Sequence, residues 1–388
     1  MKPLKDIWSE LSKPLPAGLL GAEHVGPATV VSPKEVYELS YILHRSEFTH
    51  LAEGRANAVF RIREPKDPGV PAGFFRGTLL RVPKATPDVV PCDYESLQDF
   101  QEKFVDVCVG RQHLVPQILV RITQAVATAL NARRDAALRA NANGNGNIKG
   151  CDLKSTILPG YAMLVEDMGP SPGCKALEFK PKWLAQSPLA PADATRCRTC
   201  AREALRLAKL RKKAGFRTAA VPVPAPVCPL GLLHADRAVV MSTLERLAPG
   251  PSWTERDRER LADAFRESGV LERLRDLQEE GDSGDALFTR PSDPRFGLSM
   301  TLRDCSCFVR VPVDPDAPVT IKLADVDKKN WRQKQAYWQR RHNDLVDDGW
   351  YRGAEKTPVE TACVLWLDYC LERGLEIPPA FRERLGRR

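Results

Sequence analysis

Residues 177–184, LEFKPKWL, alternate like a β-strand, and the interpretation of the whole chain starts from them. In a strand, the two apolar residues at 177 and 179 face one side, while Glu178, Lys180 and Lys182 face the other. Pro181 has no backbone N–H to donate, so this stretch lies at a strand end or at a sheet edge. Two ammonium groups and a carboxylate that project together suit a phosphate-rich ligand beside a metal or a nucleotide. A solvated strand face would show the same pattern.

The bulk composition is typical of a soluble globular protein. The chain has 388 residues, of which 43% are hydrophobic and 28% are charged. This length allows either one large core or two lobes. The formal net charge of +8 is modest for the length, so it permits an anionic ligand without implying nucleic acid.

The cysteine content and the N-terminal sequence indicate a reducing compartment. The 11 cysteines are an odd number, and residues 1–20 lack the continuous apolar segment of a secretory signal. No apolar run approaches the roughly 18 residues that a bilayer-spanning helix needs. We therefore expect the nucleus, the cytoplasm or both, without secretion or membrane association, and cysteines that are thiols or metal ligands.

Periodicity, capping and turn signals predict a mixture of helices and strands. The predicted helices are 33–44, 113–139, a segment that a capping box at 252–255 opens and that runs to about 280, and 358–373. The predicted strands are 58–63, 78–82 and 160–165. A low-complexity loop is expected at 141–147, and an extended proline-rich connector at 220–229.

Three features of the first half of the chain suit nucleotide binding. Residues 51–62 join a tight turn of small residues to an apolar strand, so backbone N–H groups can approach phosphates. Arg81 lies inside an apolar strand, where kinase-like lobes place a basic residue for nucleotide phosphates. The strand that ends at 166–168 runs into Gly169-Pro170, as at a hinge. An ordinary hairpin turn, an edge-strand arginine and a plain turn are the alternatives, since neither a P-loop nor a Gly-x-Gly-x-x-Gly motif is present.

The segment 196–217 is strongly basic, with Glu203 as its one acid. On a helix, Arg202, Arg206, Lys209 and Lys213 would share a face at spacings of four, three and four. Such a stripe repels itself unless anions lie on it, so anion binding and a solvated face are both open.

A metal site is predicted from Cys197-x-x-Cys200, followed by Cys228 and His234. Two thiolates at this spacing form half of a tetrahedral zinc site, and a further cysteine and histidine could complete it. Unrelated buried thiols are the alternative.

Acidic residues end two apolar or β-prone segments, at Asp304 and at Asp325-Val326-Asp327. Phosphoryl transfer needs carboxylates to hold Mg²⁺ and one to accept the hydroxyl proton. Asp325 and Asp327 share a face of a strand, which Lys329 continues. In isolation these would be loop acids.

The order of these motifs resembles that of the inositol-pentakisphosphate 2-kinases, in a fungal-type form. The resemblance spans roughly residues 50 to 340. The motifs that carry it are the nucleotide loop 53–57, Glu178-Phe179-Lys180-Pro181-Lys182, Cys197-x-x-Cys200 with Cys228-Pro-Leu, Arg303-Asp304-Cys305-Ser306, and Asp325-Val326-Asp327-Lys328-Lys329. The Glu-x-Lys-Pro-Lys and Asp-Cys-Ser motifs are the specific ones.

The resemblance implies a two-lobed, protein-kinase-like α/β (α+β) fold with ATP between the lobes. The implied lobes are 1–166, with the nucleotide loop, and 167–388, with the inositol phosphate and Mg²⁺ sites. The implied reaction moves the ATP γ-phosphate to the 2-hydroxyl of inositol pentakisphosphate and gives inositol hexakisphosphate. A monomer is the default expectation, and nucleic acid is not an expected partner.

Residue by residue, the resemblance implies three groups of site residues. Nucleotide contacts are implied for Gly54, Arg55, Ala56, Asn57, Arg81, Glu166, Asp167, Met168, Glu178 and Asp325. Substrate contacts are implied for Arg134, Lys182, Arg202, Arg206, Lys329, Arg332 and Tyr337. Catalysis is implied for Asp304 at the acceptor hydroxyl and Lys180 at the transferred phosphate, with Asp325 and Asp327 as Mg²⁺ ligands.

The chain departs from the family pattern at three positions. Ala52 replaces the first glycine of the nucleotide loop, and Arg55 adds a bulky side chain to the turn. Gln333 stands where the family has an arginine, for which the adjacent Arg332 could substitute.

Two other classes of protein compete with the kinase. A zinc-stapled, non-catalytic protein that binds RNA or phosphoinositides would explain the basic segment and the cysteines, but it leaves the spaced carboxylates unexplained. A protein kinase is excluded because the chain has neither a His-Arg-Asp nor an Asp-Phe-Gly motif.

Overall fold

The computed structural model describes residues 33–54, 56–86, 93–142, 155–214, 227–353 and 361–386, together with residues 4, 9, 12 and 13. The chain forms two compact units, Met1–Gly169 and Pro170–Arg388, which we call unit 1 and unit 2. Whether they act as the lobes expected at 1–166 and 167–388 stays a prediction. Arg55 and most of the predicted loop and connector lie outside the described residues.

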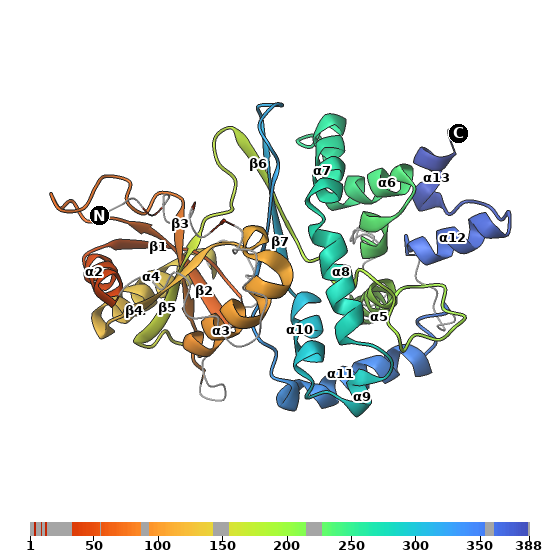
Figure 1. The fold of residues 1–388 in the computed structure, drawn as a ribbon, viewed down its shortest axis with the longest axis horizontal. Coiled ribbons are helices and arrows are strands. Elements are labelled where there is room, and N and C mark those ends of the chain that lie inside the picture. Colours follow the sequence, from red (N-terminus) through yellow and green to blue (C-terminus); the bar gives the residue numbers. More distant parts are fainter. Residues whose placement is uncertain are drawn as a thin grey trace. The chain divides into compact units, whose positions relative to one another are not determined.

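Unit 1 is built on a five-stranded antiparallel sheet in the order β1-β2-β3-β5-β4 (Figure 1). The strands are β1 (Glu47–Glu53), β2 (Asn57–Arg63), β3 (Thr78–Pro83), β4 (Gln117–Ile122) and β5 (Gly160–Glu166). Alternation along β2 buries Ala58, Phe60 and Ile62 and leaves the residues between them more exposed. The strands predicted at 58–63, 78–82 and 160–165 are therefore confirmed.

Helices cover this sheet. α2 (Pro33–His44) packs against β4, and α4 (Gln124–Ala142) packs against β1. The helix predicted at 33–44 is thus confirmed. A third helical segment consists of α3 (Tyr94–Phe100), the π-helical η1 (Gln101–Gly110) and the short turn η2 (Arg111–His113).

The single helix predicted over 113–139 is wrong in its first part, because residues 117–122 form β4. The side chains of Ile118, Val120 and Ile122 alternate into the core, and β-branched residues favour this pleated, half-buried setting. The helical pattern begins only at Gln124, where α4 buries a face that includes Val126 and Leu130.

Asp106, in η1, is a buried carboxylic acid with an unusual titration. Its side chain is 4% exposed, and its Oδ2 atom lies 3.4 Å from Nε of Arg111. Burial raises the pKa of Asp106 to about 6, although Arg111 acts in the opposite direction. The folded protein therefore prefers the protonated acid, and ionisation at neutral pH costs stability.

We expect Asp106→Asn to remove a pH-dependent loss of stability. The pKa of Asp106 in the folded protein is about 6, which is above the ordinary value of 3.8. The protonated acid therefore contributes fully to the free energy of unfolding below pH 3.8, and this contribution is lost as the pH rises through 6. About two pKa units correspond to roughly 3 kcal/mol at most. Urea unfolding at pH 4 and pH 7.5 should show a smaller decline for Asp106→Asn than for wild type. The exposed Asp99→Asn is the control, and an equal decline in all three proteins would contradict the prediction.

Unit 2 contains a three-stranded antiparallel sheet in the order β6-β7-β8. The strands are β6 (Cys174–Phe179), β7 (Ser306–Pro312) and β8 (Thr320–Ala324). The central strand β7 buries Cys307, Val309 and Val311 completely.

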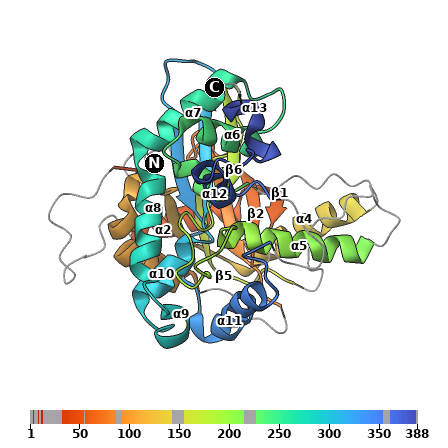
Figure 2. The same cartoon turned by 90° about the vertical axis from the view of Figure 1, so that its right-hand side faces the viewer.

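The remaining described part of unit 2 is mainly helical. Its elements are α5 (Arg198–Ala214), η4 (Pro229–Leu233), α6 (Arg237–Leu247), α7 (Glu255–Ser268), α8 (Val270–Gly281), α9 (Ala286–Thr289), α10 (Pro294–Leu302), α11 (Trp331–Asp347), α12 (Val364–Glu372) and α13 (Pro379–Leu385). Residues of α6, α12 and α13 pack around one apolar cluster with the cysteines that flank α5 (Figure 2). The helix predicted at 358–373 corresponds to α12, which begins only at Val364, because residues 361–363 are not helical and residues 358–360 lie outside the described residues. The final helix, α13, was not predicted.

The helix predicted from the capping box at 252–255 is two helices. The predicted capping box is two residues too early, because Thr254 rather than Ser252 is the N-cap. The side chains of Thr254 and Asp257 bond each other's backbone N–H groups. Gly269 then adopts φ +61°, a left-handed conformation that ends α7 and starts α8. A glycine at this position permits the break without a steric penalty, and the sequence pattern did not predict it.

Two antiparallel sheets with packed helices confirm the predicted α+β class. Among the described helices, none has the length and apolar character that crossing a bilayer requires.

Candidate functional site

The segment 177–184 leaves the sheet of unit 2 earlier than expected. β6 ends at Phe179, so Lys180 and Lys182 follow the strand and do not project from it. Lys182 adopts φ +57°, which is rare for a residue with a side chain and is found most often at functional sites. Glu178 remains in β6, where it is exposed and pairs with Phe308 of β7.

Three ammonium groups surround one carboxylate. Asp304 lies in the short connection between α10 and β7, and its Oδ1 atom is 3.1 Å from Nζ of Lys182. Its Oδ2 atom is 2.9 Å from Nζ of Lys329. Lys180 donates to the Asp304 carbonyl oxygen at 2.6 Å, and its Nζ lies 3.8 Å from Oδ1. The structure thus brings together four predicted site residues from three separate segments of unit 2.

The lysines control the ionisation of Asp304. Burial by itself would raise the pKa of this acid, but Lys329, Lys182 and Lys180 outweigh burial and lower the pKa to about 2. Burial lowers the pKa of Lys182, and Asp304 opposes that change. The Asp304 side chain is 49% exposed, so the charge cluster is open to an anionic ligand.

Asp325 lies beside this cluster, directly after β8. The prediction that Asp325, Asp327 and Lys329 share one face of a strand is wrong, because the strand ends at Ala324. Its Oδ2 atom is 3.9 Å from Nζ of Lys180 and accepts a hydrogen bond of 3.4 Å from Ser306 Oγ. Asp325 also has a positive φ of +55°, which directs the chain out of the strand. The carbonyl oxygen of Asp327 accepts a hydrogen bond from Thr301 at 3.2 Å.

A basic and aromatic set from α5 and α11 adds to the lysines. Arg202 of α5 acts electrostatically on both Lys182 and Tyr337. Burial raises the pKa of Tyr337, but Arg341, Arg202 and Lys334 outweigh burial and lower it. Sequence reasoning missed Lys334 and Arg341, although their spacing of three and four residues from Tyr337 puts all three on one helix face.

Arg206 and Arg332, the other two arginines predicted to contact the substrate, each interact with a side chain on their own helix. Arg206 is exposed and pairs with Glu203 on the same helix. Arg332 is exposed, and its guanidinium lies 5.3 Å from the centre of the Trp331 ring. Their roles stay predictions.

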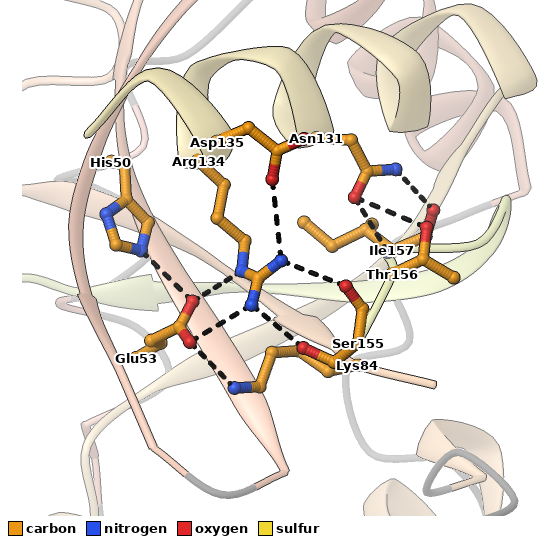
Figure 3. Close-up of polar contacts among 9 residues, drawn as sticks. All are labelled: His50, Glu53, Lys84, Asn131, Arg134, Asp135, Ser155, Thr156 and Ile157. Carbon is orange, nitrogen blue, oxygen red and sulfur yellow. Dashed lines mark hydrogen bonds and ion pairs between the residues drawn. The ribbon is translucent and has the colours of Figure 1, made fainter. Parts of the chain in front are cut away.

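In unit 1, the predicted nucleotide loop begins at Glu53, whose carboxylate is fully buried (Figure 3). It accepts hydrogen bonds from Nε of Arg134 at 2.5 Å and from Nζ of Lys84 at 3.0 Å. Nε2 of His50 lies 3.5 Å away. Arg134 also donates to the carbonyl oxygen and the hydroxyl of Ser155, at 2.9 and 2.8 Å. We call this group the Glu53 cluster.

The structure places Arg134 inside the Glu53 cluster. Its side chain is 1% exposed, and its guanidinium is occupied by Glu53 and Ser155. Arg134 is therefore a structural partner of the loop in this structure, and the substrate contact that the family resemblance implies stays a prediction. The backbone supports the same loop, because Gly54 N–H donates to Asn57 at 2.9 Å and Lys84 N–H donates to Ala56 at 2.8 Å.

We expect Arg134→Met to destabilise unit 1. Removing one member of a buried ion pair typically costs about 3 to 5 kcal/mol, and Lys84, which still pairs with Glu53, should keep the loss toward the lower end of that range. Thermal and urea unfolding should therefore show a clear loss relative to wild type. Arg133→Met is the matched control, because Arg133 is the exposed neighbour on the same helix. Equal stability of the two variants would show that the Glu53 cluster contributes nothing measurable.

Asn57 and Arg81 face each other at the start of β2. With its amide oriented to satisfy both neighbours, Asn57 accepts from Nη2 of Arg81 at 2.7 Å and donates to the Tyr94 hydroxyl at 2.7 Å. The Arg81 guanidinium lies 5.6 Å from the centre of the Tyr94 ring. Two predicted nucleotide residues are therefore in direct contact.

The predicted hinge residues follow β5. The N–H of Glu166 donates to Pro116 at 3.1 Å, and that of Asp167 donates to Gly77 at 2.8 Å. Met168 is 3% exposed. This segment is fixed by the ends of neighbouring elements, and its contacts with the nucleotide stay predictions.

Four cysteines converge in unit 2: Cys197, Cys200, Cys228 and Cys363 are all buried, and their sulfur atoms all lie within 4.8 Å of one another. Cys197 and Cys228 are 3.8 Å apart, and Cys228 and Cys363 are 4.0 Å apart. Hydrogen bonds from the other three thiols lower the pKa of Cys363 well below its ordinary range. Within the described residues, this is the one group of three or more metal-ligating side chains that converges.

The prediction that His234 completes the metal site is wrong, and Cys363 takes that place. His234 Nε2 instead lies 3.1 Å from Oδ1 of Asp368, and its Nδ1 accepts from the N–H of Asp236 at 3.0 Å. Cys363 escaped sequence reasoning because 135 residues separate it from Cys228. It precedes α12, whose residues Val364 and Leu367 lie in the same apolar cluster as the other three cysteines.

Arg246 of α6 is a half-buried cation near these thiols, and its Nε and Nη2 atoms are buried. Among the described residues, its Nε and Nη2 atoms have no hydrogen-bond partner, while Nη1 donates to Ala380 at 2.9 Å. Burial lowers the pKa of Arg246, and Cys228 and Cys200 are among the groups that raise it. An arginine with buried, unpaired N–H groups fits a site that carries net negative charge.

Comparison with known families matches residues 50–344 to the inositol-pentakisphosphate 2-kinase family. The chain therefore belongs to this family, which confirms the resemblance drawn from the motifs. A protein of Yarrowia lipolytica named inositol-pentakisphosphate 2-kinase is 36% identical over 178 residues, which are 45% of this chain and 53% of that protein. The match thus spans about half the length of this relative.

Proposed function

We propose that the protein is a kinase that transfers the γ-phosphate of ATP to the 2-hydroxyl of inositol pentakisphosphate. The observation that carries this proposal is the contact of Asp304 with Lys180, Lys182 and Lys329. Three ammonium groups within 4 Å of one carboxylate form a site for several phosphates around one acid.

The lysines suit the acceptor. An inositol pentakisphosphate carries many negative charges, and each close charge pair at a partly wet site contributes about a few kcal/mol. Lys182 and Lys329 would hold acceptor phosphates, with Arg202, Tyr337 and Arg341 beside them. This arrangement supplies local positive charge without a large net charge on the chain.

Asp304 would receive the hydroxyl proton and orient the acceptor oxygen. Without a ligand its pKa is about 2, so it is ionised at neutral pH but a weak base. When phosphates engage the three lysines, they draw positive charge away from the carboxylate and raise its basicity. Phosphoryl transfer needs charge neutralisation and positioning more than strong base catalysis, so this environment suits the reaction.

Asp325 would hold Mg²⁺ together with ATP phosphates, and Asp327 would assist. Mg²⁺ usually binds one or two carboxylates together with substrate phosphates and water, and the half-exposed Asp325 oxygens fit that role. When bound, Mg²⁺ neutralises charge on the transferring phosphoryl group. Lys180, which lies between Asp304 and Asp325, would contact the same phosphate.

Unit 1 would supply the remaining nucleotide contacts. The loop at Gly54, Ala56 and Asn57 is held in place by the Glu53 cluster, which would present the loop to the ATP phosphates. Arg81 would contact phosphate through the position that Asn57 and Tyr94 fix. Residues 166–168 would contact the base, and Glu178 would lie at the nucleotide.

The cysteine cluster would hold a structural zinc ion. Four thiol sulfurs are a complete tetrahedral set with no position left for substrate, so the site would be closed and non-catalytic. Zinc with four thiolates has a net charge of about −2, which the half-buried Arg246 would offset. The ion would join the start of α5 to η4 and α12.

A Mg-ATP assay with purified protein tests the proposal. ADP should form only when inositol pentakisphosphate and Mg²⁺ are both present. ADP formation at the same rate with and without inositol pentakisphosphate would contradict the proposed kinase activity. Steeply salt-dependent RNA binding without ATP binding would instead favour the non-catalytic alternative. Placement in the nucleus or cytoplasm and the monomeric state stay predictions.

A further inference from the structure

Residues near the end of helix α8 contact the two segments that carry Lys182 and Asp304. Gln278 of α8 is fully buried, and its side-chain amide reaches the segment that follows β6. Its Nε2 donates to the carbonyl oxygen of Lys182 at 2.9 Å, and its Oε1 accepts from the N–H of Leu184 at 3.0 Å. One amide thus satisfies an acceptor and a donor two residues apart.

These two hydrogen bonds act on a strained backbone. Lys182 has φ +57°, a conformation that residues with a Cβ adopt only when their surroundings impose it. The bonds from Gln278 hold the carbonyl group of Lys182 and the N–H group of Leu184, so they fix the peptide unit that follows Lys182 and oppose its relaxation to an ordinary conformation. Relaxation would swing the Lys182 side chain, whose Nζ lies 3.1 Å from Asp304.

The same helix end also fixes the segment that carries Asp304. The fully buried guanidinium of Arg303 donates to the backbone carbonyl of Gln278 at 3.0 Å and to Oδ2 of Asp282 at 2.6 Å. The guanidinium also lies 3.5 Å from the centre of the ring of Trp183, the residue that follows Lys182. Arg303, the residue before Asp304, therefore contacts both α8 and Trp183, the residue after Lys182.

We propose that Gln278 is a positioning residue that sets the Lys182 ammonium group against Asp304 for binding of the inositol phosphate. Gln278 contacts neither reactant, and it acts through the backbone conformation of Lys182. The inference rests on the proposed function for the identity of the ligand. It adds a residue that no motif in the sequence indicates.

The test compares Gln278→Met with Gln278→Glu. Methionine keeps the length of the side chain and removes both hydrogen bonds. Glutamate keeps the acceptor for Leu184 and removes the donor to Lys182, so it serves if the methionine variant fails to fold. Glu280→Gln, an exposed change on the same helix, is the control.

We expect the KM for inositol pentakisphosphate to rise about tenfold or more in both variants, while the KM for ATP stays unchanged. A merely structural role would lower the fraction of active protein, so kcat would fall with both KM values unchanged. That outcome in either folded variant would overturn the inference.

Calorimetric titration of inositol pentakisphosphate separates this inference from the proposed function. If wild type binds the ligand but does not turn it over, the kinase proposal fails, and weaker binding by the Gln278 variants still supports the positioning role. Equal affinity of wild type and both variants would overturn the positioning role alone. Absence of binding by folded wild type would overturn both.

Discussion

Asp304→Asn is expected to abolish phosphate transfer while leaving binding of inositol pentakisphosphate intact or stronger. Asparagine keeps the size of the side chain but cannot take the hydroxyl proton, and such losses are typically about 10² to 10⁴-fold. Binding should not suffer, because the change removes a negative charge that repels the acceptor phosphates. The three lysines stay in place to hold them.

Transfer rates and titration calorimetry together check this prediction. Asp316→Asn is the matched control, since Asp316 is an exposed acid in the turn between β7 and β8. Wild-type turnover in Asp304→Asn would remove Asp304 from the mechanism. Loss of inositol pentakisphosphate binding in a folded variant would show that Asp304 serves mainly to organise the lysines.

Cys363→Ser is expected to lose the bound zinc and much of the stability of unit 2. Structural zinc contributes directly to folding free energy, and a serine hydroxyl is a poor substitute for a thiolate. The change should separate α12 from the start of α5, because Cys363 would be the zinc ligand that joins them and its sulfur accepts a hydrogen bond from the N–H of Cys197. Metal analysis should give about one zinc per wild-type chain and almost none in the variant.

His234→Ala distinguishes this site from the one that sequence spacing predicted. His234 pairs with Asp368, outside the thiol cluster, so the variant should keep its zinc. Cobalt substitution provides a second readout, because four thiolate ligands give an absorption spectrum different from three thiolates with one imidazole. Zinc loss in His234→Ala with retention in Cys363→Ser would contradict the assignment.

Local sequence features could predict three strands of unit 1 and the residues of the lysine site. Alternation along 58–63 determines a strand because each apolar residue has a buried position in the same sheet. The motif at 178–182 and the acids at 304 and 325 were recognisable because each carries its chemistry within a few residues. The structure adds that the backbone at Lys182 and Asp325 is strained, which residue identity alone does not reveal.

Features that depend on distant contacts could not be predicted. Residues 115, 119, 122 and 126 fit a helical period, but pairing of β4 with β5 decides that 117–122 is a strand. Arg134 has the charge of a ligand contact, yet its position beside Glu53 follows from packing of α4 on β1. Cys363 and Gln278 join their sites only through tertiary structure, since no spacing connects them with Cys228 or Lys182.

The most direct test of the account is the choice of acceptor isomer. Purified protein is incubated with Mg-ATP and either the inositol pentakisphosphate that lacks the 2-phosphate or an isomer that lacks another phosphate, and the products are separated by anion exchange. The account predicts a hexakisphosphate product from the isomer with the free 2-hydroxyl and none from the other. Equal conversion of both isomers, or no conversion by folded protein, would contradict it.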